Sequence, residues 1–143
     1  DLPRTMEYLE TKGVSVVGYQ TKVLPAFYTR ESDIKLRHHV DSAKELANII
    51  YTKDQLNLKG GVLVANPIPQ KDSLDADYMN KIIDKAVKQS VKDHVQGKDV
   101  TPFLLKKIVE ETDGKSLKAN LALVYNNASV GAKIAKTYFK LLK

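Results

Sequence analysis

The sequence predicts a helix-rich fold of the α/β class. Two short apolar runs, residues 14–19 and 62–65, lie next to glycines and have the composition of buried strands. Longer segments around them repeat apolar residues at helical spacing. Two strands are too few to cover this much apolar helix surface, so either further strands lie outside the 143 residues or the domain is mostly helical.

The composition is that of an ordinary globular protein, with 43% hydrophobic and 28% charged residues. The absence of cysteine excludes disulfides, thiolate catalysis and cysteine metal sites. It also fits an intracellular protein, for which we expect the cytoplasm, with a mitochondrial or other organellar location as the alternative. No apolar run approaches the ~20 residues that a membrane span needs, so we expect no membrane partner.

The net charge of +6 raises nucleic acid as a partner. The lysines are, however, spread along helical segments with acids between them, and no run of five like charges occurs. We therefore expect a solvated basic face. A phosphorylated small substrate would also suit this excess of positive charge.

The first helix is expected at residues 2–12, with Asp1 as its N-cap, Pro3 in its first turn and Gly13 as its stop. A strand at residues 14–19 follows. Because the chain opens without an initiator Met, we expect it to be a fragment or a processed piece.

Residues 20–40 are irregular, with a short extended piece expected at 26–29. An irregular segment of this length in a compact domain is often functional, and this one contains Phe27 and other aromatic, cationic and titratable groups. His38 and His39 are adjacent and would point in opposite directions in an extended chain. We therefore expect no metal pair there.

A helix that ends near Gln55 precedes the second strand, residues 62–65, and Ser42 and Glu45 match the capping box that starts such a helix. A strand, a crossover with a helix and another strand favour parallel pairing. The prolines of residues 66–69 then extend the chain beyond the strand. Ligands bind at the carboxyl ends of strands in such sheets, so this loop is a candidate pocket wall, with a rigid turn as the alternative.

Three helices complete the chain. The first covers residues 74–94, the second starts at Thr101 as N-cap with Pro102 as first helical residue, and the third covers residues 116–143 with Ser116 as its cap.

The last of these helices contains two amides among apolar residues. Apolar side chains occupy about half of its circumference and lysines the other half. Asn120 and Asn127 lie nearly superimposed in the middle of the apolar half, and Asn126 falls at its edge. A buried amide without a hydrogen bond costs about 1–3 kcal/mol. Each amide therefore needs a partner, either a neighbouring loop in the core or a ligand.

Common catalytic and ligand-binding motifs are absent, including G-x-G-x-x-G, the Walker A loop, G-x-S-x-G, H-E-x-x-H and the calcium loop. Paired carboxylates lie on helices among lysines, as on a solvated surface. The residues therefore contain no recognisable self-sufficient catalytic set.

Several blocks resemble one family, and the most specific are GVLVANPIP, TPFLLKKI and SLKANLALVYNNA. They resemble the C-terminal half of the pseudouridine-5'-phosphate glycosidase family, which includes the indigoidine-cluster A protein. The resemblance implies that residues 1–143 are the C-terminal portion of a single domain whose N-terminal half is absent. It also implies an α/β/α layered fold with a mixed central sheet, assembled as a homotrimer.

Members of this family reversibly cleave the C–C glycosidic bond of pseudouridine 5'-phosphate to uracil and ribose 5-phosphate. The resemblance implies a lysine Schiff base with the sugar, a glutamate proton donor and a divalent metal, Mn²⁺. An iminium is a sensible electron sink for a poor carbon leaving group. All three groups are expected upstream of Asp1, so we assign no catalytic and no metal residue here and predict that this chain alone is inactive.

One site residue carries over from the family, the asparagine of the S-L-x-x-N-x-A-L-V block, which is Asn120 and is expected near the uracil base. An amide offers a donor and an acceptor to a pyrimidine edge. Asn127, two turns along the same helix, and Phe27, from its position, are weaker candidates for substrate binding. Two alternatives stay open: a non-catalytic basic α/β module that binds a nucleotide or RNA, and a family relative with a different C-glycoside substrate.

Overall fold

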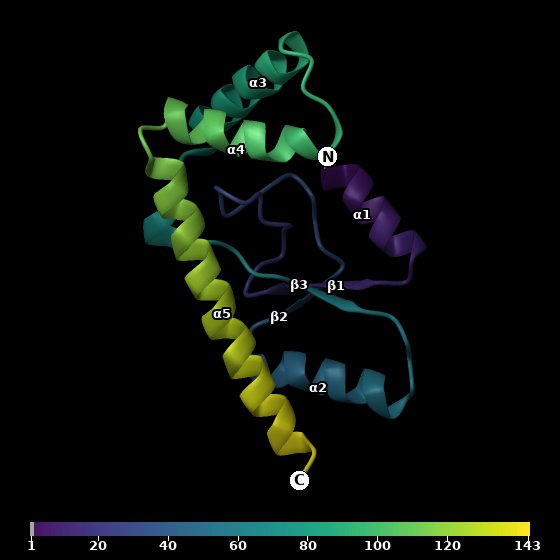
Figure 1. The fold of residues 1–143 in the computed structure, drawn as a ribbon. Coiled ribbons are helices and arrows are strands. Elements are labelled where there is room, and N and C mark those ends of the chain that lie inside the picture. Colours follow the sequence, from purple (N-terminus) through teal and green to yellow (C-terminus); the bar gives the residue numbers. More distant parts are fainter. Residues whose placement is uncertain (1) are drawn as a thin grey trace. The chain divides into compact units, whose positions relative to one another are not determined.

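The structure is a computed structural model that describes residues 2–143, so the predicted N-cap, Asp1, lies outside the described residues. The chain divides into two compact units. The first unit comprises the described residues up to Ala26 together with Glu31–Pro67 and Tyr125–Lys143, and the second comprises Phe27–Arg30 and Ile68–Val124. Figure 1 follows the elements along the chain.

The first unit begins with five elements, which are α1 (Leu2–Thr11), β1 (Ser15–Tyr19), β2 (His38–Val40), α2 (Ala43–Gln55) and β3 (Val62–Ala65). The second unit contains two short 3-10 helices, Gln70–Asp72 and Gly97–Asp99, and the helices α3 (Ala76–Lys92) and α4 (Val100–Glu111). The helix α5 (Lys115–Leu141) begins in the second unit and ends in the first.

The three strands form one parallel sheet in the order β2-β1-β3. Val17 of β1 lies opposite His38 on one side and Val64 on the other. The predicted parallel pairing of the two apolar strands and the helix-rich α/β class are thus confirmed. Inside the irregular segment, an isolated antiparallel bridge joins Val23 and Lys35.

The strand β2 was not predicted because two of its three residues are histidines, which give no apolar run. Residues 26–29, predicted to be extended, instead turn at Phe27 and Tyr28.

Side chains of β1 alternate between two apolar clusters, so helices cover both faces of the sheet in the first unit. Val17 and Tyr19 pack on one face with Leu46 of α2 and with Val130 and Ile134 of α5. The opposite face contributes a cluster that includes α1 and the irregular segment, namely Leu24, Leu36 and Ala65 with Met6, Val16 and Ile34 against them. This is the α/β/α layering that the resemblance implies.

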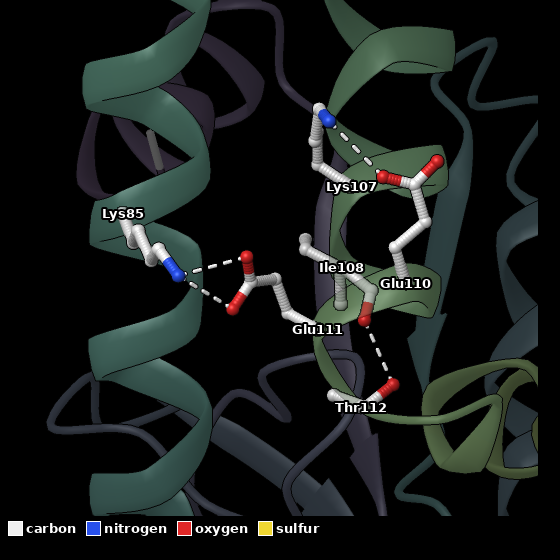
Figure 2. A network of polar contacts seen from close by, with 6 residues as sticks. All are labelled: Lys85, Lys107, Ile108, Glu110, Glu111 and Thr112. Atoms are coloured by element: carbon white, nitrogen blue, oxygen red, sulfur yellow. Dashed lines mark hydrogen bonds and ion pairs between the residues drawn. The ribbon is translucent and has the colours of Figure 1, made fainter.

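The second unit packs α3 against α4 around Met79, which is fully buried. Its other buried members are Tyr28, Ile68, Ile82, Ala86, Ile108, Ala119 and Leu123. At the surface of this packing, Nζ of Lys85 lies 2.8 Å from both carboxylate oxygens of Glu111 (Figure 2).

Helix starts agree only in part with the sequence. The capping box of Ser42 and Glu45 is present as predicted. Thr101 is not the N-cap, because the 3-10 turn Gly97–Asp99 leads directly into α4: the N-cap is Asp99, and the first helical residue is Val100 instead of Pro102. Ser116 is likewise inside the first turn of α5, where its N–H donates to the hydroxyl of Thr112 at 3.1 Å. That hydroxyl donates in turn to the Ile108 carbonyl (Figure 2).

No helix within residues 2–143 is both long enough and apolar enough to cross a lipid bilayer.

Candidate functional site

The carboxyl end of β3 bears a pair of bonded amides in the first unit. Asn66 follows the last residue of the strand, and its Nδ2 donates to Oδ1 of Asn127 on α5 at 2.8 Å. Asn126 fixes the same loop, because its Nδ2 donates to the Pro67 carbonyl at 3.2 Å. The loop of residues 66–69 is therefore held by two successive amides of the helix.

The bond between Asn66 and Asn127 leaves one hydrogen-bond acceptor group and one donor group of the pair available to a ligand. The Asn66 carbonyl oxygen keeps its lone pairs, and the Asn127 NH₂ group keeps its two donors. Asn127 is exposed, so these donors face solvent. The partner that the sequence required for Asn127 is a neighbouring loop, and the remaining polar groups lie at the edge of the sheet where ligands of α/β folds bind.

A further polar contact occurs where β1 and β2 end. Gln20 follows β1, and its Nε2 donates to the carbonyl of Asp41, which follows β2, at 3.1 Å. The carboxyl ends of all three parallel strands are therefore followed by an amide or a carboxylate side chain, from Gln20, Asp41 and Asn66. We take this edge as the candidate ligand-facing edge of the first unit.

Asn120 has a different environment, in the second unit. It is half-buried on α5 beside the buried Ala119, and Leu123 lies one turn further along. Within residues 2–143 its side chain makes no hydrogen bond to protein. Its full set of two donors and one acceptor is thus available to water or a ligand.

Phe27 lies on the short segment of the second unit that interrupts the first. Its side chain is 45% exposed and its φ is 62°, a left-handed conformation that is uncommon for a bulky residue. The ring contacts Tyr28 edge-to-face at a centroid distance of 4.6 Å. Residues held in such conformations cluster at binding sites, and holding them costs about 1–3 kcal/mol.

Tertiary bonds hold this strained turn in place. The Tyr28 ring is buried, which raises the pKa of its phenol, and its carbonyl accepts from Leu74 N–H at 3.0 Å. The Arg30 guanidinium donates to the Ile68 carbonyl. Phe27 is therefore presented at the surface by a turn whose neighbours are fixed.

The structure thus places Asn120 and Phe27 in the second unit and Asn127 in the first. Among the described residues, no hydrogen bond or ring contact joins any two of these three side chains. The sequence predicted the 66–69 loop as a candidate pocket wall, with a rigid turn as the alternative, but it did not predict Asn66 as the partner of Asn127. An asparagine directly after a buried parallel strand was the signal available for it.

Two hollows lie elsewhere. A cleft of about 380 Å³ in the first unit is lined by residues near the amino ends of β1 and β2, including Glu10 and Arg37, which form an ion pair at 2.9 Å. A groove of about 440 Å³ along α3 in the second unit is lined by Lys81, Asp84, Lys85, Lys88, Gln89 and Lys92. Acids lie among these lysines, as predicted for a solvated basic face, and Glu111 pairs with Lys85 (Figure 2).

The described residues contain no group of three or more His, Asp or Glu side chains that could hold a metal ion. His38 and His39 are both exposed on β2.

The chain is similar to known proteins in both sequence and fold. The family model for indigoidine synthase A like proteins matches residues 1–137. A protein of Staphylococcus aureus strain MW2 named pseudouridine-5'-phosphate glycosidase is 59% identical over 142 residues, which are 99% of this chain and 46% of that protein. A protein of the same name from Caldanaerobacter subterraneus subsp. tengcongensis is 54% identical over 143 residues, or 100% of this chain and 47% of the relative. The chain thus spans a little under half the length of these relatives.

Two solved structures have the same fold. The prealnumycin C-glycosynthase AlnA, solved in complex with ribulose 5-phosphate, matches with a TM-score of 0.90 and 31% identity over 99% of this chain and 47% of its own. An indigoidine synthase A-like protein from Thermotoga maritima matches with a TM-score of 0.82 and 34% identity over 94% of this chain and 44% of its own.

Proposed function

Because this chain belongs to the indigoidine synthase A like family, we propose that it is the C-terminal half of a glycosidase acting on pseudouridine 5'-phosphate. The complete protein would cleave the C–C glycosidic bond reversibly, releasing uracil and ribose 5-phosphate. The observation that carries the proposal is the 59% identity to the Staphylococcus aureus relative that bears this enzyme name.

In this proposal the covalent chemistry belongs to the half of the relatives' length that this chain does not span. A lysine amine there adds to C1 of the sugar as the ring oxygen leaves C1 and the ribose opens. The nitrogen lone pair then forms the C1=N iminium as the C–C bond breaks, the electron pair of that bond leaves with the uracil carbon, and water hydrolyses the iminium to ribose 5-phosphate and the free lysine. A glutamate from the same half exchanges the proton with the uracil carbon. A lysine and a carboxylate of this chain are not needed for either step.

This chain contributes recognition of the base. The imide edge of uracil presents an N–H donor between two carbonyl acceptors. The Asn120 amide can accept from that N–H and donate to a carbonyl, and no other described residue occupies those groups. Phe27 supplies an exposed aromatic surface on a fixed turn, and Asn127 holds the loop after β3 in position through Asn66.

Manganese and the homotrimer belong to the same proposal. The donor set of residues 2–143 does not fit an ion, because it lacks a group of three His, Asp or Glu side chains. We therefore place the Mn²⁺ ligands in the other half and derive no step through the metal. The resemblance to the family supports assembly as a homotrimer.

A second candidate function has its own support. The prealnumycin C-glycosynthase shares the fold with a TM-score of 0.90, and by its name it forms a C-glycoside. A protein with this chain could therefore join a sugar phosphate to an aromatic acceptor other than uracil. Substrate tests in both directions separate the two functions, because the glycosidase would accept uracil plus ribose 5-phosphate in the reverse reaction.

The test is a chimera in which this chain replaces the matching part of the Staphylococcus aureus relative. We expect the chimera to release uracil from pseudouridine 5'-phosphate, measured by chromatography, and this chain alone to release none. A folded chimera without uracil release would contradict the proposed substrate. Uracil release by this chain alone would contradict the assignment of the catalytic lysine and glutamate to the other half.

A further inference from the structure

The first-unit part of α5 has two opposite apolar faces. One face is buried against the sheet through Val130 and Ile134. The other, which we call the outer stripe, consists of Tyr125, Ala128, Ala132, Ala135 and Phe139, all exposed. At ~100° per residue these five positions fall within a sector about 80° wide, on the side of the helix away from Val130.

The exposure is large for apolar side chains. Tyr125 is 73% and Phe139 63% exposed. A helix that is apolar on opposite sides is typical of one buried on both sides. The three alanines between the two rings leave room for another backbone to approach closely.

A basic flank runs beside the outer stripe. It consists of Lys133, Lys136 and Lys140, and α5 contains no acidic residue. Within residues 2–143 none of these lysines forms an ion pair. The flank therefore suits a partner that carries carboxylates next to its own apolar face.

The sheet of the first unit is also open. β2 and β3 are its two edges, and neither has a further strand beside it among the described residues. Leu63 of β3 is 41% exposed. Parallel sheets are normally covered on both faces, so this unit lacks cover in more than one place.

We propose that the outer stripe binds the other half of the family fold, the segment that the relatives have and this chain does not span. The relatives are about twice as long as this chain, which covers 46% of the Staphylococcus aureus protein, so a segment of sufficient size exists in each of them. The proposal rests on the half-chain assignment made above, and it adds the surface and the chemistry of the contact: an apolar face flanked by carboxylates.

A second copy of this chain explains the surface less well. In a two-fold dimer of this chain, the two copies would cover one self-complementary patch, whereas in the homotrimer proposed above each subunit is the complete protein and already contains the other half. The uncovered apolar residues of the first unit lie both on α5 and on the edge strand β3. A copy would also bring its own lysine flank toward this one, and like charges placed together oppose binding.

The test is co-expression of this chain with the unmatched segment of the Staphylococcus aureus relative, followed by size exclusion with light scattering and a binding titration. Ala135→Arg places a charge in the outer stripe. Ser129→Arg is the matched control, with the same introduced side chain at another small exposed residue about 120° away on the same helix, among the lysines. We expect a 1:1 complex whose affinity falls about tenfold or more with Ala135→Arg and much less with Ser129→Arg.

Three results would overturn the proposal: no complex with the native chain, equal losses for the two arginine variants, or native dimers of this chain that Ala135→Arg dissociates. Circular dichroism of both variants checks folding, and Ala132→Gln repeats the test without a charge if Ala135→Arg does not fold. Binding alone decides the docking proposal, and uracil release by the complex is measured separately as a test of the proposed function. A complex that binds but releases no uracil would contradict the proposed function and leave the docking surface supported.

Discussion

At the scale of single residues, Asn120 and Asn127 show how the same side chain at equivalent helical positions can have two roles. Asn127 bonds Asn66 at 2.8 Å and so positions the loop after β3. Asn120 is half-buried and makes no hydrogen bond to the described protein. Of the two alternatives that the sequence left open, a loop partner is present for Asn127, and a ligand stays a prediction for Asn120.

We expect Asn120→Ala in the chimera to lower kcat/KM for pseudouridine 5'-phosphate by up to about tenfold, because one or two hydrogen bonds to an uncharged base are lost. Asn120→Asp should cost more, since a carboxylate cannot donate to the uracil carbonyl. Steady-state kinetics with uracil detection measure both effects. Lys118→Ala, exposed on the same helix, is the control. Unchanged turnover and unchanged substrate affinity in both Asn120 variants would remove this residue from the site.

The positions of side chains around a periodic helix could be predicted from the sequence, but the strained backbone conformation of Phe27 could not. The spacing of Asn120 and Asn127 identified both amides as requiring partners. Nothing in the local sequence around Phe27 indicates a φ of 62°, because that conformation depends on the bonds of Tyr28 and Arg30 to distant residues.

At the scale of elements, the start of α2 makes a prediction about pH. The Glu45 carboxylate accepts from the N–H of Asp41 at 2.8 Å and of Ser42 at 3.1 Å, and these bonds lower the pKa of Glu45 below its ordinary value. A lowered folded-state pKa means that the contribution to stability is present above the unfolded-state pKa and is lost as pH falls through the folded-state pKa.

Glu45→Gln should therefore reduce the free energy of unfolding at neutral pH. The difference in unfolding free energy between variant and native chain should shrink as the pH falls from above the unfolded-state pKa of Glu45 to below its folded-state pKa. Urea unfolding at a series of pH values measures it. Asp54, whose pKa is lowered chiefly by the hydrogen bond from Tyr138, is present in both proteins and cancels in the comparison. A difference that is constant with pH would mean that the capping bonds do not depend on the charge.

Elements with a clear side-chain pattern were predicted well, and β2, which has none, was not. The span of α2 and the strand β3 agree with their predicted residues. β2 has only three residues and pairs through its backbone, so no side-chain pattern identifies it. The start of α4 differs from prediction because the 3-10 turn Gly97–Asp99 continues directly into the helix, and that of α5 differs because the Thr112 hydroxyl accepts from the N–H of Ser116.

At the scale of the whole molecule, the chain has two compact units whose border is not visible in the sequence. The first unit takes in three separate stretches of chain, and its border with the second falls inside α5. A composition shift or a flexible linker marks many domain boundaries, and neither occurs within a continuous helix. The resemblance to a single-domain family therefore predicted the class and the layering, while the division into units depends on contacts between distant residues.

One substitution in each unit should destabilise that unit. A Cβ on Gly18 in β1 would lie 2.1 Å from the Thr21 carbonyl oxygen and 2.9 Å from Cδ1 of Leu36, so Gly18→Ala forces the backbone of the first unit to move. Met79 has no exposed surface in the second unit, so Met79→Ala leaves a cavity there. We expect losses of about 1–3 kcal/mol for Gly18→Ala and about 2–5 kcal/mol for Met79→Ala.

Hydrogen exchange read by mass spectrometry locates each loss. Gly18→Ala should reduce protection in β1, β2 and β3 while α3 and α4 keep theirs, and Met79→Ala should do the reverse, because separate cooperative units of one protein can open independently. The helix α5 serves as the internal reference, since Val130 and Ile134 belong to one core and Ala119 and Leu123 to the other. If either substitution lowered protection uniformly over residues 2–143, the two cores would form a single cooperative unit. The sequence-based expectation of one undivided domain portion would then describe the unfolding better than the division into units does.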